Sequence, residues 1–336
     1  MIIGNRRAKS SVTLTDIATA CNIAPSTVSR ALSNPGRVSA KTYQLVIEKA
    51  QELGYTKNGG QPAGTTLDRG QLVLVVPNLT NPYVFEMIRG CQAQAQAANY
   101  LLSIVNTAES VQLEADTLRQ LSWAVDGIIL IAPRCADEIV QKAAAEVPLV
   151  VINRDVAGCE SIIVDTAGGM AGVVDHLAQL GHESIGYVGG PLTSWSDSRR
   201  YSALAAAARK RGLSCERIGS FPPTVEAGAA AADSLLLTDA SAAVFFNDVL
   251  AIGALTRFAA RGVRVPKDFS VVGCDDIMAA SWCAPPLTTL SAAGEGVGRL
   301  ATDVLINGLT STAAERVVQR VPVHLTVRQS TGPRIT

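Results

Sequence analysis

The stretch from residue 12 to residue 58, VTLTDIATACNIAPSTVSRALSNPGRVSAKTYQLVIEKAQELGYTKN, has the pattern of three short helices separated by tight turns. We expect Thr13 to cap the first helix and Asn22 to end it, because threonine accepts free first-turn amides and asparagine tolerates left-handed geometry. Pro25 begins the second helix and Ser39 the third. Two helices joined by a short turn and supported by a third predict a helix-turn-helix.

One face of each predicted helix is apolar, so the three helices can pack around a small common core. The residues expected to face that core are Leu14, Ile17, Ala18, Val28, Leu32, Val46, Ala50 and Leu53. The outward face of the second helix carries hydrogen-bond donors: Ser26, Thr27, Ser29 and Arg30. An ordinary three-helix bundle would show the same periodicity, so this pattern alone does not assign a function.

Charge separates these alternatives. Residues 1–57 carry eight lysines and arginines against three acids, a net charge of +5. The rest of the chain has 21 basic and 26 acidic residues, so the neutral total of 29 against 29 conceals a cationic head. Such a head can neutralise phosphates and release counterions, which favours nucleic-acid binding.

The segment closely resembles the DNA-binding head of LacI/GalR-type bacterial transcription regulators, and the similarity continues along the chain. The head motifs are T-L-T-D-I-A, S-T-V-S-R-A-L, R-V-S-A-K-T and E-L-G-Y-T-K-N. Later motifs are V-V-P-N-L-T-N-P-Y at 75–83, G-I-I-L-I-A-P at 127–133, H-L-A-Q-L-G-H at 176–182, and V-P-K-D-F-S-V-V-G-C-D-D-I with P-P-L-T-T-L at 265–290. They follow the family order, so the resemblance is specific.

The resemblance implies which head residues contact DNA. In the family pattern the base-contacting positions are 25, 26 and 30, which here are Pro25, Ser26 and Arg30. Arg30 can make a bidentate contact to guanine, worth about 1–3 kcal/mol of discrimination, whereas Pro25 offers only an apolar surface. The residues expected to bind phosphates are Thr13, Thr27, Ser29, Arg37, Ser39, Thr42 and Asn58.

A linker at 58–70 follows the head, which occupies residues 1–57. In the resembled family this stretch folds into a hinge helix on the operator, and a leucine from it enters the minor groove. Here Gly64 occupies the leucine position, and Pro62 and two further glycines oppose a helix. We therefore expect no normal hinge helix; Leu67 is either a substitute wedge or the first buried residue of the body.

From Gln71 onward, short β-rich runs alternate with helical stretches, a pattern typical of βαβ units and parallel sheets. The resemblance implies an α/β body of the periplasmic-binding-protein type, with two lobes and a ligand cleft at the carboxyl ends of the strands. We expect this body at 71–333, with lobe 1 at about 71–164 and 291–319 and lobe 2 at about 165–290 and 320–333. The expected strands are 72–76, 101–105, 127–131, 149–152, 161–164, 184–188, 242–246 and 269–273, with a C-terminal strand near 322–328.

Polar and aromatic residues follow two expected strands of lobe 1, where open α/β sheets bind ligands. Tyr83 and Phe85 could stack on a sugar or a base, although one of the two could instead pack the following helix. Asn153 and Asp155 could bind ligand hydroxyls or merely form a turn.

In lobe 2 the resemblance implies four more effector-binding residues. Trp195 and Arg200 lie in the family's ligand loop, and Arg200 matches the arginine that forks onto effector oxygens; a surface ion pair is the alternative. Asn247 and Asp275 each follow an expected strand and match two further effector-binding positions.

The class of effector stays open from the sequence. Arginine, aspartate and asparagine with aromatic rings suit a polyhydroxylated compound. Arg134 or Arg154 beside Arg200 could also accept an acid or a phosphate. We therefore expect a sugar, a sugar acid or a nucleoside-like molecule.

At 336 residues, of which 48% are hydrophobic and 17% charged, the chain can bury a large core and is long for one domain. Its apolar runs are too short to span a membrane and it shows no signal peptide, so we expect a cytoplasmic protein. Seven scattered cysteines without a C-x-x-C pair indicate free thiols. Three separated histidines predict no metal site, and we expect no cofactor.

Catalytic motifs such as G-x-S-x-G or a phosphate-binding loop are absent from the sequence, which disfavours an enzyme of sugar metabolism. The cationic head disfavours a transport-associated sugar-binding protein that uses the body alone. We therefore predict a ligand-responsive repressor of a carbohydrate or related catabolic operon. It would bind a near-palindromic double-stranded operator as a homodimer, with the effector between its lobes. Since no leucine-heptad tail follows, we expect a dimer and not a tetramer.

Overall fold

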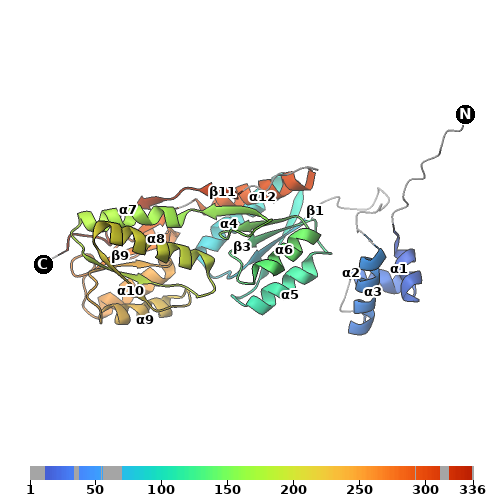
Figure 1. The fold of residues 1–336 in the computed structure, drawn as a ribbon, viewed down its shortest axis with the longest axis horizontal. Helices are drawn as coiled ribbons and strands as arrows, with labels where there is room; N and C mark the ends of the chain where they lie inside the picture. Colours follow the sequence, from blue (N-terminus) through green and yellow to red (C-terminus); the bar gives the residue numbers. More distant parts are fainter. Residues whose placement is uncertain are drawn as a thin grey trace, which may run out of the picture. The chain divides into compact units, whose positions relative to one another are not determined.

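The computed structural model describes residues 12–33, 38–53, 55, 70–291, 293–310 and 318–334. The chain divides into two compact units, Met1–Asp68 and Arg69–Thr336, and the division falls within the predicted linker. The described part of the first unit is helical, and the second unit is an α/β body (Figure 1).

The first unit contains three helices, and its first helix begins with a capping box. The Thr13 hydroxyl accepts the amide of Asp16, while the Asp16 carboxylate accepts the amide of Thr13 at 2.7 Å. Asn22 ends that helix with a left-handed φ of 52°. The predicted caps are therefore confirmed. The helices are α1 (Leu14–Cys21), α2 (Pro25–Ser33) and α3 (Ala40–Leu53).

Buried side chains from all three helices, among them Ile17, Val28 and Val46, form the core of this unit. The expectation for Leu53 is wrong, because its side chain is 39% exposed. Tyr55, beyond the end of α3, packs against the core instead, and its amide donates to the Ala50 carbonyl at 2.9 Å. The chain turns back at this bond, so the core closes through Tyr55.

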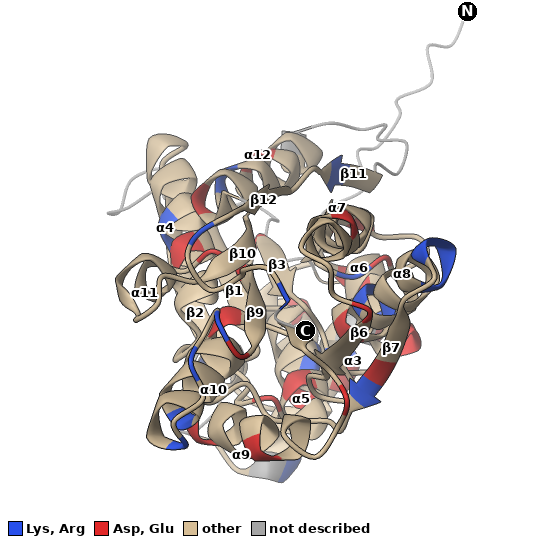
Figure 2. Cartoon of the chain, turned by 90° about the vertical axis from the view of Figure 1, so that its left-hand side faces the viewer, with Lys and Arg blue, Asp and Glu red and all other residues tan. Residues whose placement is uncertain are grey.

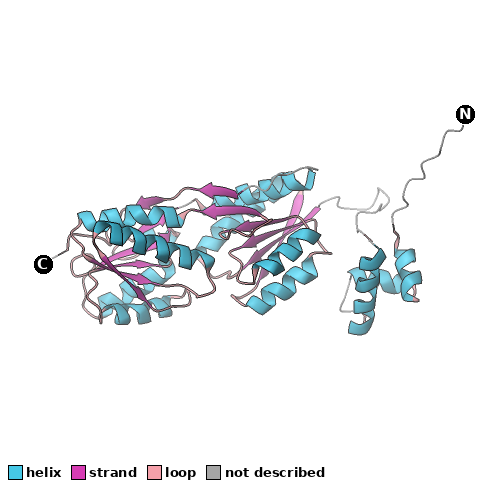
Figure 3. Cartoon of the chain, viewed as in Figure 1, coloured by secondary structure: helices cyan, strands magenta, loops and turns pink. Residues whose placement is uncertain are grey.

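The second unit contains two six-stranded sheets, one in each lobe (Figure 3). The first sheet has the order β11-β5-β4-β3-β1-β2 and the second β12-β10-β9-β8-β6-β7. All strand pairs are parallel except β10 with β12. The strands of the first sheet are β1 (Gly70–Val76), β2 (Tyr100–Asn106), β3 (Gly127–Ile131), β4 (Leu149–Ile152), β5 (Glu160–Val164) and β11 (Val318–Val321). Those of the second are β6 (Ser184–Val188), β7 (Ser214–Ile218), β8 (Ala242–Phe245), β9 (Ser270–Asp275), β10 (Thr288–Ser291) and β12 (His324–Thr326).

The chain passes between the lobes three times: after β5, after β10 and after β11. Strand β11 continues to Val321, two residues beyond the end that we expected for lobe 1. Each lobe therefore consists of segments that are separated in the sequence. All three passages between the lobes follow the carboxyl ends of the strands β5, β10 and β11.

Helices cover both faces of each sheet. In lobe 1, Leu72 and Leu74 face α4 and α12, whereas Val73 and Val75 face α5 and α6, because side chains alternate along a strand. In lobe 2 the same alternation separates α9 and α10 from α7 and α8. The helices of lobe 1 are α4 (Pro82–Ala97), α5 (Val111–Leu121), α6 (Asp137–Glu146) and α12 (Gly294–Thr310). Those of lobe 2 are α7 (Thr166–Gln179), α8 (Trp195–Arg211), α9 (Val225–Leu235), α10 (Asp248–Ala260) and α11 (Met278–Trp282).

Charged residues of lobe 2 lie on its helices, in its loops and on the edge strand β7, and acidic and basic residues are interspersed (Figure 2). Several of them pair at the surface: Arg211 with Asp175 at 2.7 Å, and Arg257 with Asp233 at 2.7 Å. Exposed pairs of this kind contribute little to stability, so the buried apolar layers carry the fold.

Glycines allow the two helices on one face of lobe 1 to cross closely. A Cβ atom at Gly298 of α12 would lie 2.1 Å from the Met87 carbonyl oxygen of α4. A Cβ atom at Gly90 of α4 would lie 2.0 Å from the Glu295 carbonyl oxygen. Since both obstacles are backbone atoms, neither helix can accept a side chain there without moving.

We predict that Gly298→Ala destabilises the protein by about 1–3 kcal/mol, because the added methyl group forces α12 away from α4. Urea unfolding followed by far-UV circular dichroism measures this loss. Gly308→Ala, in the same helix but with open space around it, is the matched control and should be neutral or slightly stabilising. Equal effects of the two substitutions would contradict the close-packing explanation.

Candidate functional site

Helix α2 presents polar side chains to solvent. Pro25, Ser26, Ser29 and Arg30 are exposed, and Thr27 is partly buried. The Arg30 side chain folds back over its helix, where Nε donates to the Ser26 carbonyl at 3.3 Å. Arg30 and Ser26, four residues apart, thus lie on the same face of α2.

Three predicted phosphate-binding residues take part in helix caps. The Thr13 hydroxyl donates to the Asp16 carboxylate at 2.8 Å. The Ser39 hydroxyl accepts the amide of Thr42 at 3.1 Å and lies 2.8 Å from the Thr42 hydroxyl. These side chains are exposed or half-buried at helix starts, where backbone amides favour anions. Arg37 and Asn58 lie outside the described residues.

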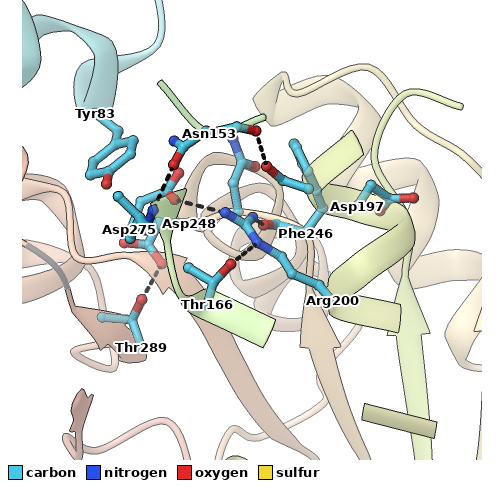
Figure 4. Close-up of polar contacts among 12 residues, drawn as sticks. Tyr83, Asn153, Thr166, Asp197, Arg200, Phe246, Asp248, Asp275 and Thr289 are labelled. Carbon is cyan, nitrogen blue, oxygen red and sulfur yellow. Dashed lines mark hydrogen bonds and ion pairs between the residues drawn. The ribbon is translucent and has the colours of Figure 1, made fainter. Parts of the chain in front are cut away.

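In the second unit, Arg200 of α8 is the centre of a buried polar cluster (Figure 4). Its Nε donates to the Thr166 hydroxyl at 2.8 Å, and its Nη1 donates to the Phe246 carbonyl at 2.5 Å. Its guanidinium carbon lies 5.0 Å from the centre of the Phe246 ring. The predicted alternative, a surface ion pair, does not hold, because this side chain is almost fully buried.

Asp275, the last residue of β9, is the charge partner of Arg200. Its carboxylate lies 3.7 Å from Arg200 Nη2, and its φ of 119° is strained for a residue with a side chain. Burial raises the pKa of Asp275 to about 8, against the opposing effect of Arg200. The carboxyl group is therefore held where ionisation is costly.

Two buried polar atoms in this region have no hydrogen-bond partner: the Tyr83 hydroxyl and Nδ2 of Asn247. Asn247 caps α10, where its Oδ1 accepts the Leu250 amide at 3.1 Å, so only its amide nitrogen remains available. Tyr83 belongs to lobe 1 and points toward Asp275 of lobe 2 (Figure 4). Burial raises the pKa of Tyr83 well above its usual value, which keeps the phenol neutral. Unpaired buried polar atoms cost free energy unless a ligand or water pairs with them.

Asn153 has a mainly structural set of contacts. Its φ is 60°, and its Oδ1 accepts the Val164 amide at 3.2 Å. Its carbonyl accepts the Ser196 hydroxyl at 3.2 Å, a bond that joins the two lobes. The chain bends at Asn153, and the residue also contacts lobe 2 through Ser196.

Other predicted effector residues lie differently. Phe85 is 58% exposed on α4, opposite in the helical turn to the buried Tyr83. Trp195 is partly exposed and stacks with Arg199, whose guanidinium carbon lies 5.3 Å from the ring centre. Asp155 is partly buried. The structure therefore brings Tyr83, Arg200, Asn247 and Asp275 together and leaves Phe85 outside the cluster.

The sequence interpretation missed two acids near this cluster. Asp248 is fully buried; it accepts the Thr289 hydroxyl at 2.6 Å and the Ile277 amide at 2.9 Å. Asp276 accepts the Ser291 hydroxyl at 2.7 Å and pairs with Arg328 at 2.6 Å. Both acids form hydrogen bonds that fix the turn of the chain directly after Asp275. The one sequence signal was their position directly after Asn247 and Asp275.

A separate cavity of about 330 Å³ lies at the far edge of lobe 2, against the C-terminal segment. Its arginines already pair with acids: Arg264 with Asp268 at 2.6 Å and Arg334 with Glu183 at 2.5 Å. Within the described ranges, no group of acids, histidines and cysteines has the arrangement of a metal site. None of the helices described is both long and apolar enough to cross a membrane.

Comparisons with known proteins agree with this division into head and body. Residues 13–58 match the family described as "Bacterial regulatory proteins, lacI family", and residues 174–331 match the "Periplasmic binding protein-like domain". The chain is 30% identical to the HTH-type transcriptional repressor CytR of Escherichia coli strain K12, over 97% of this chain and 98% of that protein.

Two solved structures are similar over nearly the whole chain. One is the lac repressor dimer bound to operator and the anti-inducer ONPF, at 26% identity and a TM-score of 0.72, covering 96% of this chain and 99% of that one. The other is the transcriptional regulator CelR–cellobiose complex, at 25% identity and a TM-score of 0.70, covering 95% and 99%.

Proposed function

The chain belongs to the LacI family of bacterial regulatory proteins, and we propose that it represses a carbohydrate or related catabolic operon in response to a small effector. As a LacI-family transcriptional repressor with an effector-binding body, it is not an enzyme. The observation that carries the proposal is the head: a three-helix unit whose second helix presents Ser26 and Arg30 to solvent. The protein would bind its operator in the cytoplasm, where bacterial DNA lies.

We infer that α2 enters the major groove, where Pro25, Ser26 and Arg30 contact bases. The exposure of Arg30 and the short helix support this docking. The helix starts at Thr13 and Ser39 then face phosphates, since free first-turn amides and hydroxyls bind anions. The further phosphate contacts in this proposal are Thr27, Ser29, Arg37, Thr42 and Asn58.

We predict that Arg30→Ala relaxes the preference for one base pair of the operator by about tenfold or more, because a bidentate contact to guanine is lost. Quantitative gel shifts with single-base operator variants measure this effect, after footprinting of the protein's own promoter region has located the site. The slope of the logarithm of the operator-binding constant against the logarithm of the salt concentration should change by no more than about one, the value for a single phosphate contact.

Lys49→Ala is the matched control for Arg30→Ala. Lys49 belongs to α3 and pairs with Glu52 at 2.5 Å, so its loss should leave base preference intact. The docking proposal is refuted if Arg30→Ala weakens all operator variants equally. The function itself is refuted if no palindromic site is protected at moderate salt, with or without effectors.

The effector would bind between the lobes, where Tyr83 meets Arg200 and Asp275 (Figure 4). Asn247 is next to them, because it follows Phe246, whose carbonyl accepts from Arg200. The two unpartnered atoms support this site, because they come from opposite lobes and a ligand could pair with both. Asn153, Asp155 and Trp195 would line its margins, while Phe85 would contribute least because it is exposed. In this proposal the effector is a sugar, a sugar acid or a nucleoside-like compound.

A ligand at this position would change the balance between lobe arrangements. It can do so only by as much as its affinities for the arrangements differ. The Ser196–Asn153 bond is one contact between lobes that such a movement would make or break. Operator affinity and effector affinity must then change each other by the same factor.

We predict that Arg200→Ala abolishes the thermal stabilisation of the protein by any sugar or nucleoside that stabilises the wild type. The reason is that Arg200 supplies charged donors inside a buried site. A thermal-shift screen against a carbohydrate and nucleoside panel makes the measurement. Arg211→Ala, at the exposed end of the same helix, is the control and should keep every stabilisation. Unchanged stabilisation of Arg200→Ala would place the effector elsewhere.

We further propose that two copies pair through apolar residues that the single chain leaves exposed. The edge strand β2 exposes Leu101 by 54% and also exposes Ile104, and α11 exposes Trp282 by 71% and Met278 by 64%. Exposed edge strands and apolar patches are costly in a monomer and typical of interfaces. A twofold pair would present two heads to a near-palindromic operator.

Sedimentation equilibrium should therefore give the mass of two chains. We predict that Leu101→Glu shifts the equilibrium toward one chain, because it places a charge in the apolar interface. Leu237→Glu, at an 89% exposed position away from β2 and α11, is the control and should leave the dimer intact. A mass of one or four chains for the wild type would contradict this assembly.

A further inference from the structure

Four arginines lie near the strand ends that surround the cluster of Tyr83, Arg200, Asn247 and Asp275. Each of these arginines already forms an ion pair with an acidic side chain. These pairs are Arg134 with Glu109 at 2.7 Å, Arg154 with Asp137 at 2.6 Å, Arg328 with Asp276 at 2.6 Å, and Arg200 with Asp275 at 3.7 Å. Arg154 also donates to two backbone carbonyls, those of Pro133 and Cys135. A phosphate or carboxylate on a ligand would have to compete with a carboxylate that is already in place.

Acidic groups outnumber basic groups in the surroundings of Asp275. The charged residues that influence it most are Arg200, Asp248 and Glu86, which are one cation and two acids. Burial raises the pKa of Asp275 to about 8, the pKa of Asp248 to about 6, and the pKa of Glu86 as well. A ligand anion in the same place would meet the same desolvation, and above the pKa of Asp275 it would also meet repulsion from the ionised carboxylate.

In this cluster, the two buried atoms without a hydrogen-bond partner belong to neutral groups. Nδ2 of Asn247 is an amide donor, and the Tyr83 hydroxyl can donate or accept. These groups match hydroxyl, ether and carbonyl oxygens, and the Asp275 carboxylate can accept a hydroxyl proton. A polyhydroxylated or heterocyclic molecule without a charge can satisfy all of them, whereas an anion would leave Asp275 opposed to it.

We propose that the effector is an uncharged molecule, and that Asp275 and Glu86 exclude its phosphorylated and carboxylated relatives. This proposal rests on the proposed function, because it takes the cluster around Arg200 as the effector site. It narrows the three classes considered above to neutral sugars and nucleosides. Once ionised, Asp275 acts by pairing with Arg200 at 3.7 Å, and Glu86 acts by adding negative charge from lobe 1.

Inorganic phosphate tests this proposal without knowledge of the effector. Thermal unfolding of the full chain is measured with and without phosphate at pH 9, where Asp275 is ionised, at an ionic strength matched with chloride. The variants are Asp275→Asn, Glu86→Gln, their combination, and the combination with Arg200→Ala. Asp233→Asn is the control, since it frees two arginines on the surface that have no part in the cluster: Arg257 and Arg261.

We expect phosphate to leave the wild type and Asp233→Asn unshifted. The combined variant should gain a rise in Tm of about 3–5 °C at ten times its Kd for phosphate, and adding Arg200→Ala should remove it. If Asp275→Asn prevents folding, Glu86→Gln alone, at a partly exposed position, should still show a smaller gain.

Phosphate stabilisation of the wild type that depends on Arg200 would overturn the proposal. So would folded variants that gain nothing, because Asp275 and Glu86 would then not be the excluding groups. Operator binding by the same wild-type preparation is measured in parallel. Its failure would count against the proposed function, whereas the phosphate results depend on the cluster alone.

Discussion

A buried guanidinium is the constraint around which the body is organised. A charge removed from water must be paired and hydrogen-bonded, or the fold loses several kcal/mol. Arg200 meets this requirement with a hydroxyl from the start of α7, a carbonyl at the end of β8 and a carboxylate at the end of β9. Those partners come from three elements that are far apart in sequence. Their convergence ties the ends of β8 and β9 to the start of α7.

Much of the fold could be predicted from the sequence because its strands are continuous apolar runs. The eight strands expected before the C-terminal segment are present, with ends that differ by at most two residues. Strands β7, β10 and β11 were missed. β11 is a short edge strand whose side chains are all partly or fully exposed. β7 is an edge strand with exposed polar side chains, and β10 buries Thr288 and Thr289, which satisfy their hydroxyls by hydrogen bonds that no periodicity reveals.

The candidate site was less accessible to sequence reasoning. Arg200, Asn247 and Asp275 were identified through the family resemblance and their positions after strands, and the structure brings them together. Position after a strand could not show that the Asn153 amide bonds within its own lobe, or that Asp248 lies under the Asp275 corner. Those contacts join residues 11 and 29 positions apart, and they depend on packing between elements. The pattern on α4 likewise gave no way to distinguish the buried Tyr83 from the exposed Phe85.

The residues beside the proposed effector position also hold the first passage between the lobes. Asn153 accepts the Val164 amide on one side of that passage, and Arg200 donates to the Thr166 hydroxyl on the other. Substitutions that retune what this pocket recognises therefore also disturb the resting equilibrium of the empty protein. With the effector site proposed above, a change in recognition would also alter the background level of transcription, and second-site changes elsewhere in the body would have to restore it.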